Sequence, residues 1–200
     1  MALSEKDYEQ SARELQCETA ALKAVVDIES RGSGFLPDGR PKILFEAHIF
    51  SRFTKHKFDE DFPHISSPGW NRSLYKGGKG EWDRLAEAVN LDRRAALMAC
   101  SWGLFQIMGF NFTLCGFTTI EAFVEAMKGG EDRHLDAFVA FIKTVHLDDE
   151  LRRHDWAGFA RGYNGPGFRA NRYDTKLNLA YQKYSVQQEG NNGTPQNQIA

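Results

Sequence analysis

Glu29 stands where a carboxyl group could act as a catalytic acid. The stretch from Ala20 to Phe35 has helical periodicity, and Glu29 shares its apolar face. The apolar members of that face are Leu22, Val25 and Val26. Because Gly32 and Gly34 end the helix, we expect Glu29 in its last turn, beside unpaired carbonyls at the negative end of the macrodipole. Desolvation and this dipole should raise the pKa of Glu29 and keep it protonated, as protonation of a glycosidic oxygen requires. A solvated surface glutamate is the alternative.

Glu46 is the first candidate for a second catalytic carboxylate. It interrupts the apolar run Pro41 to Phe53, where a charge is costly unless it is used or paired. Pairing with His48, Arg52 or a backbone amide would be a purely structural explanation. Two further acidic candidates remain open: Asp38 and Asp59. Most glycosidases need such a second carboxylate, because a base or nucleophile must act opposite the acid.

Two glycine-containing turns carry further polar side chains. In Ser101 to Gly109, SWGLFQIMG, Gly103 permits close backbone approach, and Gln106 offers both a donor and an acceptor to a ligand. In Gly162 to Gly167, GYNGPG, a helix ends and presents the polar tips of Tyr163 and Asn164 on a rigid turn. An ordinary helix terminus is the alternative for each turn.

A long irregular segment runs from Thr54 to Gly80, where six prolines and glycines prevent a regular helix. Its aromatic residues are Phe58, Phe62, Trp70 and Tyr75, and its basic residues near the end are Arg72, Lys76 and Lys79. The aromatic rings suit the wall of a carbohydrate cleft, since ring faces pack on the apolar faces of sugars. A lid over the core is the alternative.

Composition excludes several classes of protein. A net charge of -2 over 200 residues argues against a dedicated nucleic-acid binder, and no apolar run is long enough to cross a bilayer. The start MALSEKDYEQ lacks the pattern of a signal peptide. Three unpaired cysteines, Cys17, Cys100 and Cys115, suggest reduced core thiols and synthesis in the cytoplasm. The histidines show no HExxH pattern and the cysteines no paired spacing, so neither a metal site nor a cofactor is expected.

The periodicity predicts a mainly α chain that forms one domain over residues 1–185. The expected helices are Ser4–Gln16, Thr19–Glu29, Glu81–Asn90, Arg93–Cys100, Thr118–Gly129, Glu131–His146, Trp156–Tyr163 and Tyr173–Tyr184. In Glu81–Asn90 the expected buried stripe is Trp82, Leu85, Ala86 and Val89. A small strand element is expected between Ile43 and Gly80, and residues 186–200 have too little to bury and are expected to be a disordered tail.

Three short motifs in one order resemble a known superfamily. Glu29-Ser30, the run Ser101 to Ile107 and the turn Tyr163-Asn164-Gly165 look like the three signatures of goose-type lysozymes and lytic transglycosylases. More closely, Ile28 to Phe35, the segment ILFEAHIF at positions 43–50 and the Tyr-Asn-Gly turn resemble the N-acetylmuramidase family of phage endolysins. The resemblance spans about Leu22 to Tyr184. Phe105 departs from the Met of many transglycosylases, a small change because both are apolar.

The resemblance implies a lysozyme-like helical domain, with a small strand and loop element flanking a cleft, that cuts the bond between N-acetylmuramic acid and N-acetylglucosamine in peptidoglycan. By this match Glu29 is the catalytic acid, and the cleft is lined by Ser101, Gln106, Tyr163 and Asn164. Substrate assistance by the N-acetyl group, with either hydrolysis or an anhydro product, stays open, as does a non-catalytic cell-wall-binding domain. We expect a monomer that stays in the host bacterial cytoplasm until another protein opens the membrane, without insertion into that membrane.

Overall fold

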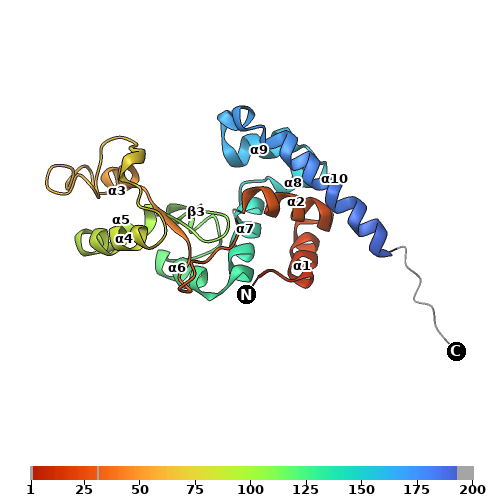
Figure 1. Ribbon diagram of the computed structural model, residues 1–200, viewed down its shortest axis with the longest axis horizontal. Coiled ribbons are helices and arrows are strands. Elements are labelled where there is room, and N and C mark those ends of the chain that lie inside the picture. Colours follow the sequence, from red (N-terminus) through yellow and green to blue (C-terminus); the bar gives the residue numbers. More distant parts are fainter. Residues whose placement is uncertain (1, 31, 193–200) are drawn as a thin grey trace. The chain divides into compact units, whose positions relative to one another are not determined.

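A computed structural model describes residues 2–30 and 32–192 of the chain (Figure 1). The described residues form two compact units, one of residues 2, 30 and 32–144, the other of residues 3–29 and 145–192. One catalytic domain over residues 1–185 stays a prediction.

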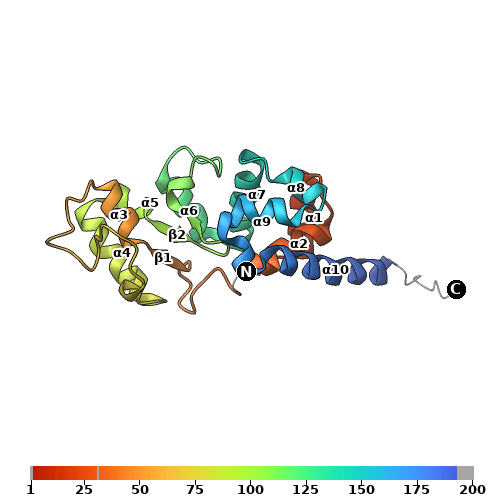
Figure 2. The same ribbon diagram turned by 90° about the horizontal axis from the view of Figure 1, so that it is seen from above.

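The second unit is entirely helical. Its elements are α1 (Glu5–Leu15), α2 (Thr19–Glu29), α8 (Asp148–Arg152), α9 (Trp156–Asn164), the 3-10 helix η3 (Pro166–Asn171) and α10 (Tyr173–Asn192). The long α10 lies alongside α2 in both ribbon views (Figures 1 and 2). As expected, Leu22, Val25 and Val26 are buried, and α2 ends at Glu29. The apolar face of α2 therefore fixes the place of the candidate acid at its end.

The C-terminal part of α10 differs from the expectation. The helix continues to Asn192, so residues 186–192, which were expected to belong to a disordered tail, are helical. Residues 193–200 of that predicted tail lie outside the described residues. Among residues 2–30 and 32–192, none of the helices is long and apolar enough to cross a membrane.

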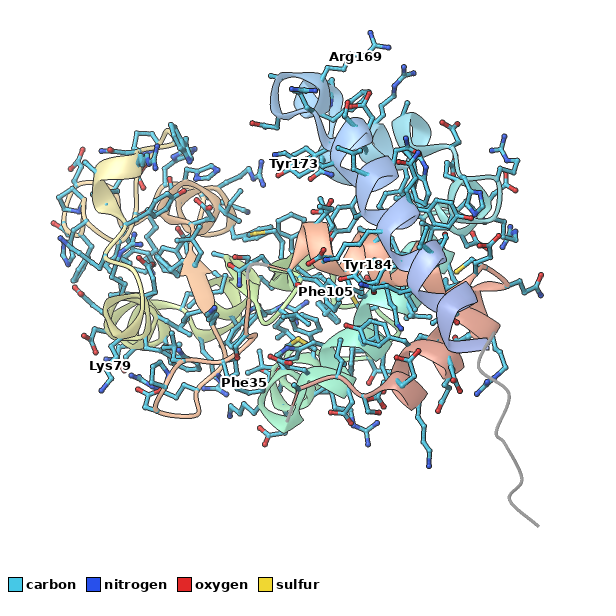
Figure 3. All side chains as sticks on the ribbon, turned by 45° about the vertical axis from the view of Figure 1, so that its right-hand side comes forward. Phe35, Lys79, Phe105, Arg169, Tyr173 and Tyr184 are labelled. Atoms are coloured by element: carbon cyan, nitrogen blue, oxygen red, sulfur yellow. The ribbon has the colours of Figure 1, made fainter. Side chains whose placement is uncertain are left out.

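The first unit combines helices with one small sheet. Its helical elements are α3 (Ala47–Phe53), η1 (Arg72–Leu74), α4 (Lys79–Leu91), α5 (Arg93–Met98), η2 (Gly109–Asn111), α6 (Ile120–Gly129) and α7 (Glu131–Thr144). Phe105, labelled in Figure 3, stacks on Phe138 of α7 with ring centroids 4.3 Å apart. This contact anchors the loop after the second strand to the helical core.

The sheet is antiparallel, with strands in the order β1 (Ile43–Phe45), β2 (Cys100–Trp102) and β3 (Ile107–Met108). Leu44 pairs with Ser101, and Ser101 pairs with Met108. The predicted strand element is thus correct for β1 but wrong in extent, since β2 and β3 lie beyond Gly80. Cys100, expected on a helix, begins β2, because β1 offers it a pairing partner from a distant part of the chain. The mainly α fold with a small strand element is confirmed.

The buried face of α4 differs from the predicted stripe. Glu81, Arg84, Leu85 and Ala88 are buried, whereas Ala86 is exposed. Glu81 Oε2 lies 2.9 Å from Arg84 Nη1, so the two charges enter the core as a pair. A buried ion pair requires further hydrogen bonds to offset desolvation, and this one has them.

Glu81 joins three segments of the first unit. Its carboxylate accepts hydrogen bonds from the backbone N–H groups of Phe45 in β1 at 3.1 Å, Lys76 at 2.6 Å and Gly77 at 3.0 Å. Burial acts to raise the pKa of Glu81, but these N–H donors and Arg84 together lower it below its ordinary value. The end of the irregular segment is therefore tied to the sheet through one ionised side chain.

Candidate active site

Glu29 and Asn164 are joined by a side-chain hydrogen bond within the helical unit. Asn164 Nδ2 donates to Glu29 Oε1 over 3.0 Å, and both residues are half-buried. Glu29 is the last residue of α2 and Asn164 is the last residue of α9. The structure thus brings together two predicted site residues that are 135 positions apart in the sequence.

Local sequence explains why α9 ends at Asn164. Gly165 has a φ of 78°, a left-handed conformation that glycine adopts without a Cβ clash, and Pro166 then starts η3. At the other end of α9, Asp155 accepts a hydrogen bond from the N–H of Gly158 at 2.8 Å. Tyr163, one residue before Asn164, stacks on Phe159 with centroids 5.8 Å apart. Both ends of α9 are therefore fixed, and Asn164 is presented on a defined turn.

Ser101 and Gln106 lie in the other unit and contact each other. Ser101 Oγ donates to Gln106 Oε1 at 2.9 Å, and Gln106 Nε2 donates to the carbonyl of Gly103 at 2.8 Å. Gln106 has a φ of 50°. These bonds close the turn between β2 and β3, a structural role that the sequence did not indicate. Their place in a substrate cleft stays a prediction.

Glu46 precedes α3 in the same unit and is largely covered. The hydroxyl of Tyr75 donates to Glu46 Oε2 at 2.7 Å, and His48 Nδ1 lies 3.3 Å from the same oxygen. The sequence predicts His48 as a possible structural partner of Glu46. It does not predict the hydrogen bond from Tyr75. Tyr75 itself accepts a hydrogen bond from the indole N–H of Trp70 at 2.8 Å. Burial and the adjacent Glu46 raise the pKa of Tyr75 to about 12, so the phenol keeps its proton near neutral pH.

The two other acidic candidates are engaged in local structure. Asp38 Oδ2 accepts from Arg40 Nη2 at 2.8 Å, and this hydrogen bond lowers the pKa of Asp38. Asp59 accepts hydrogen bonds from Ser51 and Ser66 and lies 2.9 Å from His56 Nδ1. Burial opposes ionisation of Asp59, but these contacts lower its pKa. Both carboxylates therefore hold surface loops in place.

The cysteines are packing residues. Burial raises the pKa of Cys17 to about 11, that of Cys115 to about 12, and that of Cys100 well above its ordinary value. All three are free thiols, as expected, and such protonated thiols are poor nucleophiles. In the part of the chain that the structure describes, no group of three or more His, Cys, Asp or Glu side chains could hold a metal ion.

His134 is a buried polar residue that the sequence analysis missed. Its Nδ1 accepts the N–H of Leu104 at 3.1 Å, and Nε2 lies 2.7 Å from the carbonyl of Met127. Burial lowers the pKa of His134, which fits the neutral ring that this bonding needs. Cβ atoms added at Gly34 and Gly103 would lie 2.6 Å and 2.8 Å from ring atoms of His134. In the sequence, Gly34 and Gly103 were the available signal of this packing. Because neither residue has a Cβ, both of their loops can approach the His134 ring.

The mainly helical fold with its small antiparallel sheet matches that of lysozyme-like glycoside hydrolases. A protein-family model described as N-acetylmuramidase matches residues 18–185, and the chain belongs to this family of peptidoglycan-degrading enzymes. The crystal structure of Burkholderia AP3 phage endolysin is similar, with 40% sequence identity and a TM-score of 0.87. The match covers 92% of this chain and 72% of that one. No match was found among curated proteins.

Proposed function

We propose that this muramidase hydrolyses the β-1,4 bond between N-acetylmuramic acid and N-acetylglucosamine, with Glu29 as the general acid. The carboxyl group gives its proton to the glycosidic oxygen as the bond from that oxygen to the anomeric carbon breaks. Water then adds at the anomeric carbon and gives a proton to a carboxylate, either Glu46 or the Glu29 carboxylate left by the first step, which leaves a reducing end.

The observation that carries this proposal is the position of Glu29 at the meeting of two helix ends. α2 ends at Glu29 and α9 ends at Asn164, and the side chains of these two residues are in contact. The hydrogen bond from Asn164 holds the carboxyl group in one orientation. A half-buried carboxyl group that is held in one orientation suits proton transfer to a leaving oxygen.

Replacement of Glu29 by Gln tests the proposal, since it keeps the shape of the side chain and removes the transferable proton. We expect the rate of lysis of outer-membrane-stripped cells to fall about 10²–10⁴-fold. Glu9→Gln is the matched control, because Glu9 is an exposed glutamate of α1 in the same unit, and it should leave the rate unchanged. Near-normal lysis by E29Q would exclude Glu29 as the general acid.

Product analysis separates hydrolysis from transglycosylation. In a lytic transglycosylase the 6-hydroxyl of the muramic acid attacks in place of water and forms a 1,6-anhydro end. Mass spectrometry of digested peptidoglycan should show reducing ends, which are heavier than anhydro ends by one water. Anhydro ends would exclude hydrolysis while leaving Glu29 as the acid.

The enzyme is proposed to act as a monomeric endolysin, made in the host bacterial cytoplasm and released to the cell wall when another protein opens the membrane. Its three free cysteines support synthesis in a reducing compartment. The net charge of -2 supports a partner other than nucleic acid. Light scattering of the purified protein tests the monomeric state.

A further inference from the structure

Trp70 is the only exposed aromatic residue among those whose side chains the structure describes. Its exposed fraction is 64%, whereas the other tryptophans, the phenylalanines and the tyrosines are buried or half-buried. Burying a ring of this size would stabilise the fold, at about 25 cal/mol for each Å² of apolar surface removed from water. An indole left in solvent is therefore available for a ligand.

The exposed ring is held in place. The indole N–H of Trp70 donates to Tyr75 Oη at 2.8 Å, and Tyr75 donates to Glu46 at 2.7 Å. The backbone is fixed on both sides, because Ser67 Oγ donates to the carbonyl of Gly69 and the N–H of Ser73 donates to the side chain of Asn71. A ring that is ordered before binding loses little conformational entropy when a ligand packs on it.

Three basic residues follow Trp70 closely in the sequence. Arg72 and Lys76 are exposed, and neither forms an ion pair within residues 2–30 and 32–192. Lys79, at the start of α4, has a side chain that is 73% exposed and lies 3.7 Å from Asp38 (Figure 3). Cationic side chains in the same segment as an exposed indole suit a ligand that combines sugar rings with carboxylates, as peptidoglycan does.

We propose that Trp70 stacks on a sugar ring of the peptidoglycan glycan and, through Tyr75, fixes that ring relative to Glu46. This inference rests on the proposed function, because it assigns a glycan-binding residue to the same enzyme. The indole face covers the apolar face of one pyranose, and its N–H remains bound to Tyr75. Tyr75 is then a positioning residue, since it contacts Trp70 and Glu46.

Binding without turnover tests this inference. We measure binding of an N-acetylglucosamine tetrasaccharide by calorimetry and of purified sacculi by sedimentation, both with the E29Q protein. Adding Trp70→Ala should weaken binding about 3–10-fold, the loss expected for one aromatic contact. Adding Trp70→Phe, which keeps a ring face, should stay within about twofold of E29Q alone. Leu179→Ala is the control, since it removes a comparably exposed apolar side chain from α10.

Steady-state kinetics distinguishes the proposed stacking of Trp70 on the sugar from the proposed positioning role of Tyr75. In the active protein, W70A should raise KM for peptidoglycan, whereas Tyr75→Phe should lower kcat more than it raises KM. Equal binding by W70A and L179A, at unchanged unfolding temperature, would overturn the role of Trp70. That result is distinct from failure of the proposed function, which is seen when E29Q alone remains active.

Discussion

Asn164 donates a hydrogen bond to Glu29 across 3.0 Å, and each of these residues is the last one of its helix. The ends of α2 and α9 are therefore joined through one side-chain hydrogen bond. The amide donor restricts the orientation of the Glu29 carboxyl group. In the proposed mechanism, this orientation directs the acid toward the glycosidic oxygen.

Asn164→Ala should lower kcat about 10–100-fold with little change in KM, because it removes the group that orients Glu29 while leaving the acid itself. The sequence motif instead suggested that Asn164 binds substrate. Steady-state kinetics on solubilised peptidoglycan distinguishes the two roles. Asn178→Ala, an exposed asparagine of α10, serves as the control. A raised KM at unchanged kcat would show that Asn164 contacts substrate and does not position the acid.

The stability of the sheet-containing unit should depend on Glu81 and on pH. Because the pKa of Glu81 is lowered in the folded protein, its contribution is present above its ordinary value of 4.5 and is lost as the pH falls below that value. Glu81→Gln leaves Arg84 buried without a charged partner, and we expect a loss of about 3–5 kcal/mol at pH 7. Urea unfolding between pH 3.5 and pH 7 measures both effects.

A matched control lies six residues further along α4. Glu87 pairs with His64 at 2.7 Å, but the glutamate side chain is 40% exposed, so Glu87→Gln should cost no more than about 1 kcal/mol. The difference between wild type and E81Q should shrink toward acid pH, whereas the difference between wild type and E87Q stays small. A pH-independent difference for E81Q would show that Glu81 contributes by packing alone.

The sequence predicted where several helices begin and end, because residues close to each boundary determine it. The end of α2 at Glu29 follows from the glycines at 32 and 34, and the start of α5 follows from Asp92, which accepts the N–H of Ala95. The end of α9 likewise follows from Gly165. Two of the predicted site residues, Glu29 and Asn164, were therefore placed correctly on helix ends from the sequence.

Contacts between distant segments explain what the sequence could not reveal. The β2–β3 hairpin was expected only as a glycine-containing turn after a helix, since its pairing partner β1 lies more than fifty residues earlier. The buried face of α4 was misassigned because an apolar pattern counts charged residues as exposed, while Glu81 and Arg84 are buried together. The only local signal of this ion pair in the sequence was that Glu81 and Arg84 carry opposite charges three residues apart, shortly after Gly77.

Glu46→Gln decides whether Glu46 is the second catalytic carboxylate. The amide oxygen of Gln can still accept the hydrogen bond from Tyr75, so the local structure is kept while the charge is lost. A base or nucleophile cannot act without that charge, and we expect kcat to fall at least about 100-fold. Glu60→Gln, an exposed change in the irregular segment of the same unit, is the control. Activity of E46Q close to wild type would leave Glu46 as a structural partner of Tyr75 and His48, and would point to the N-acetyl group of the substrate as the internal nucleophile.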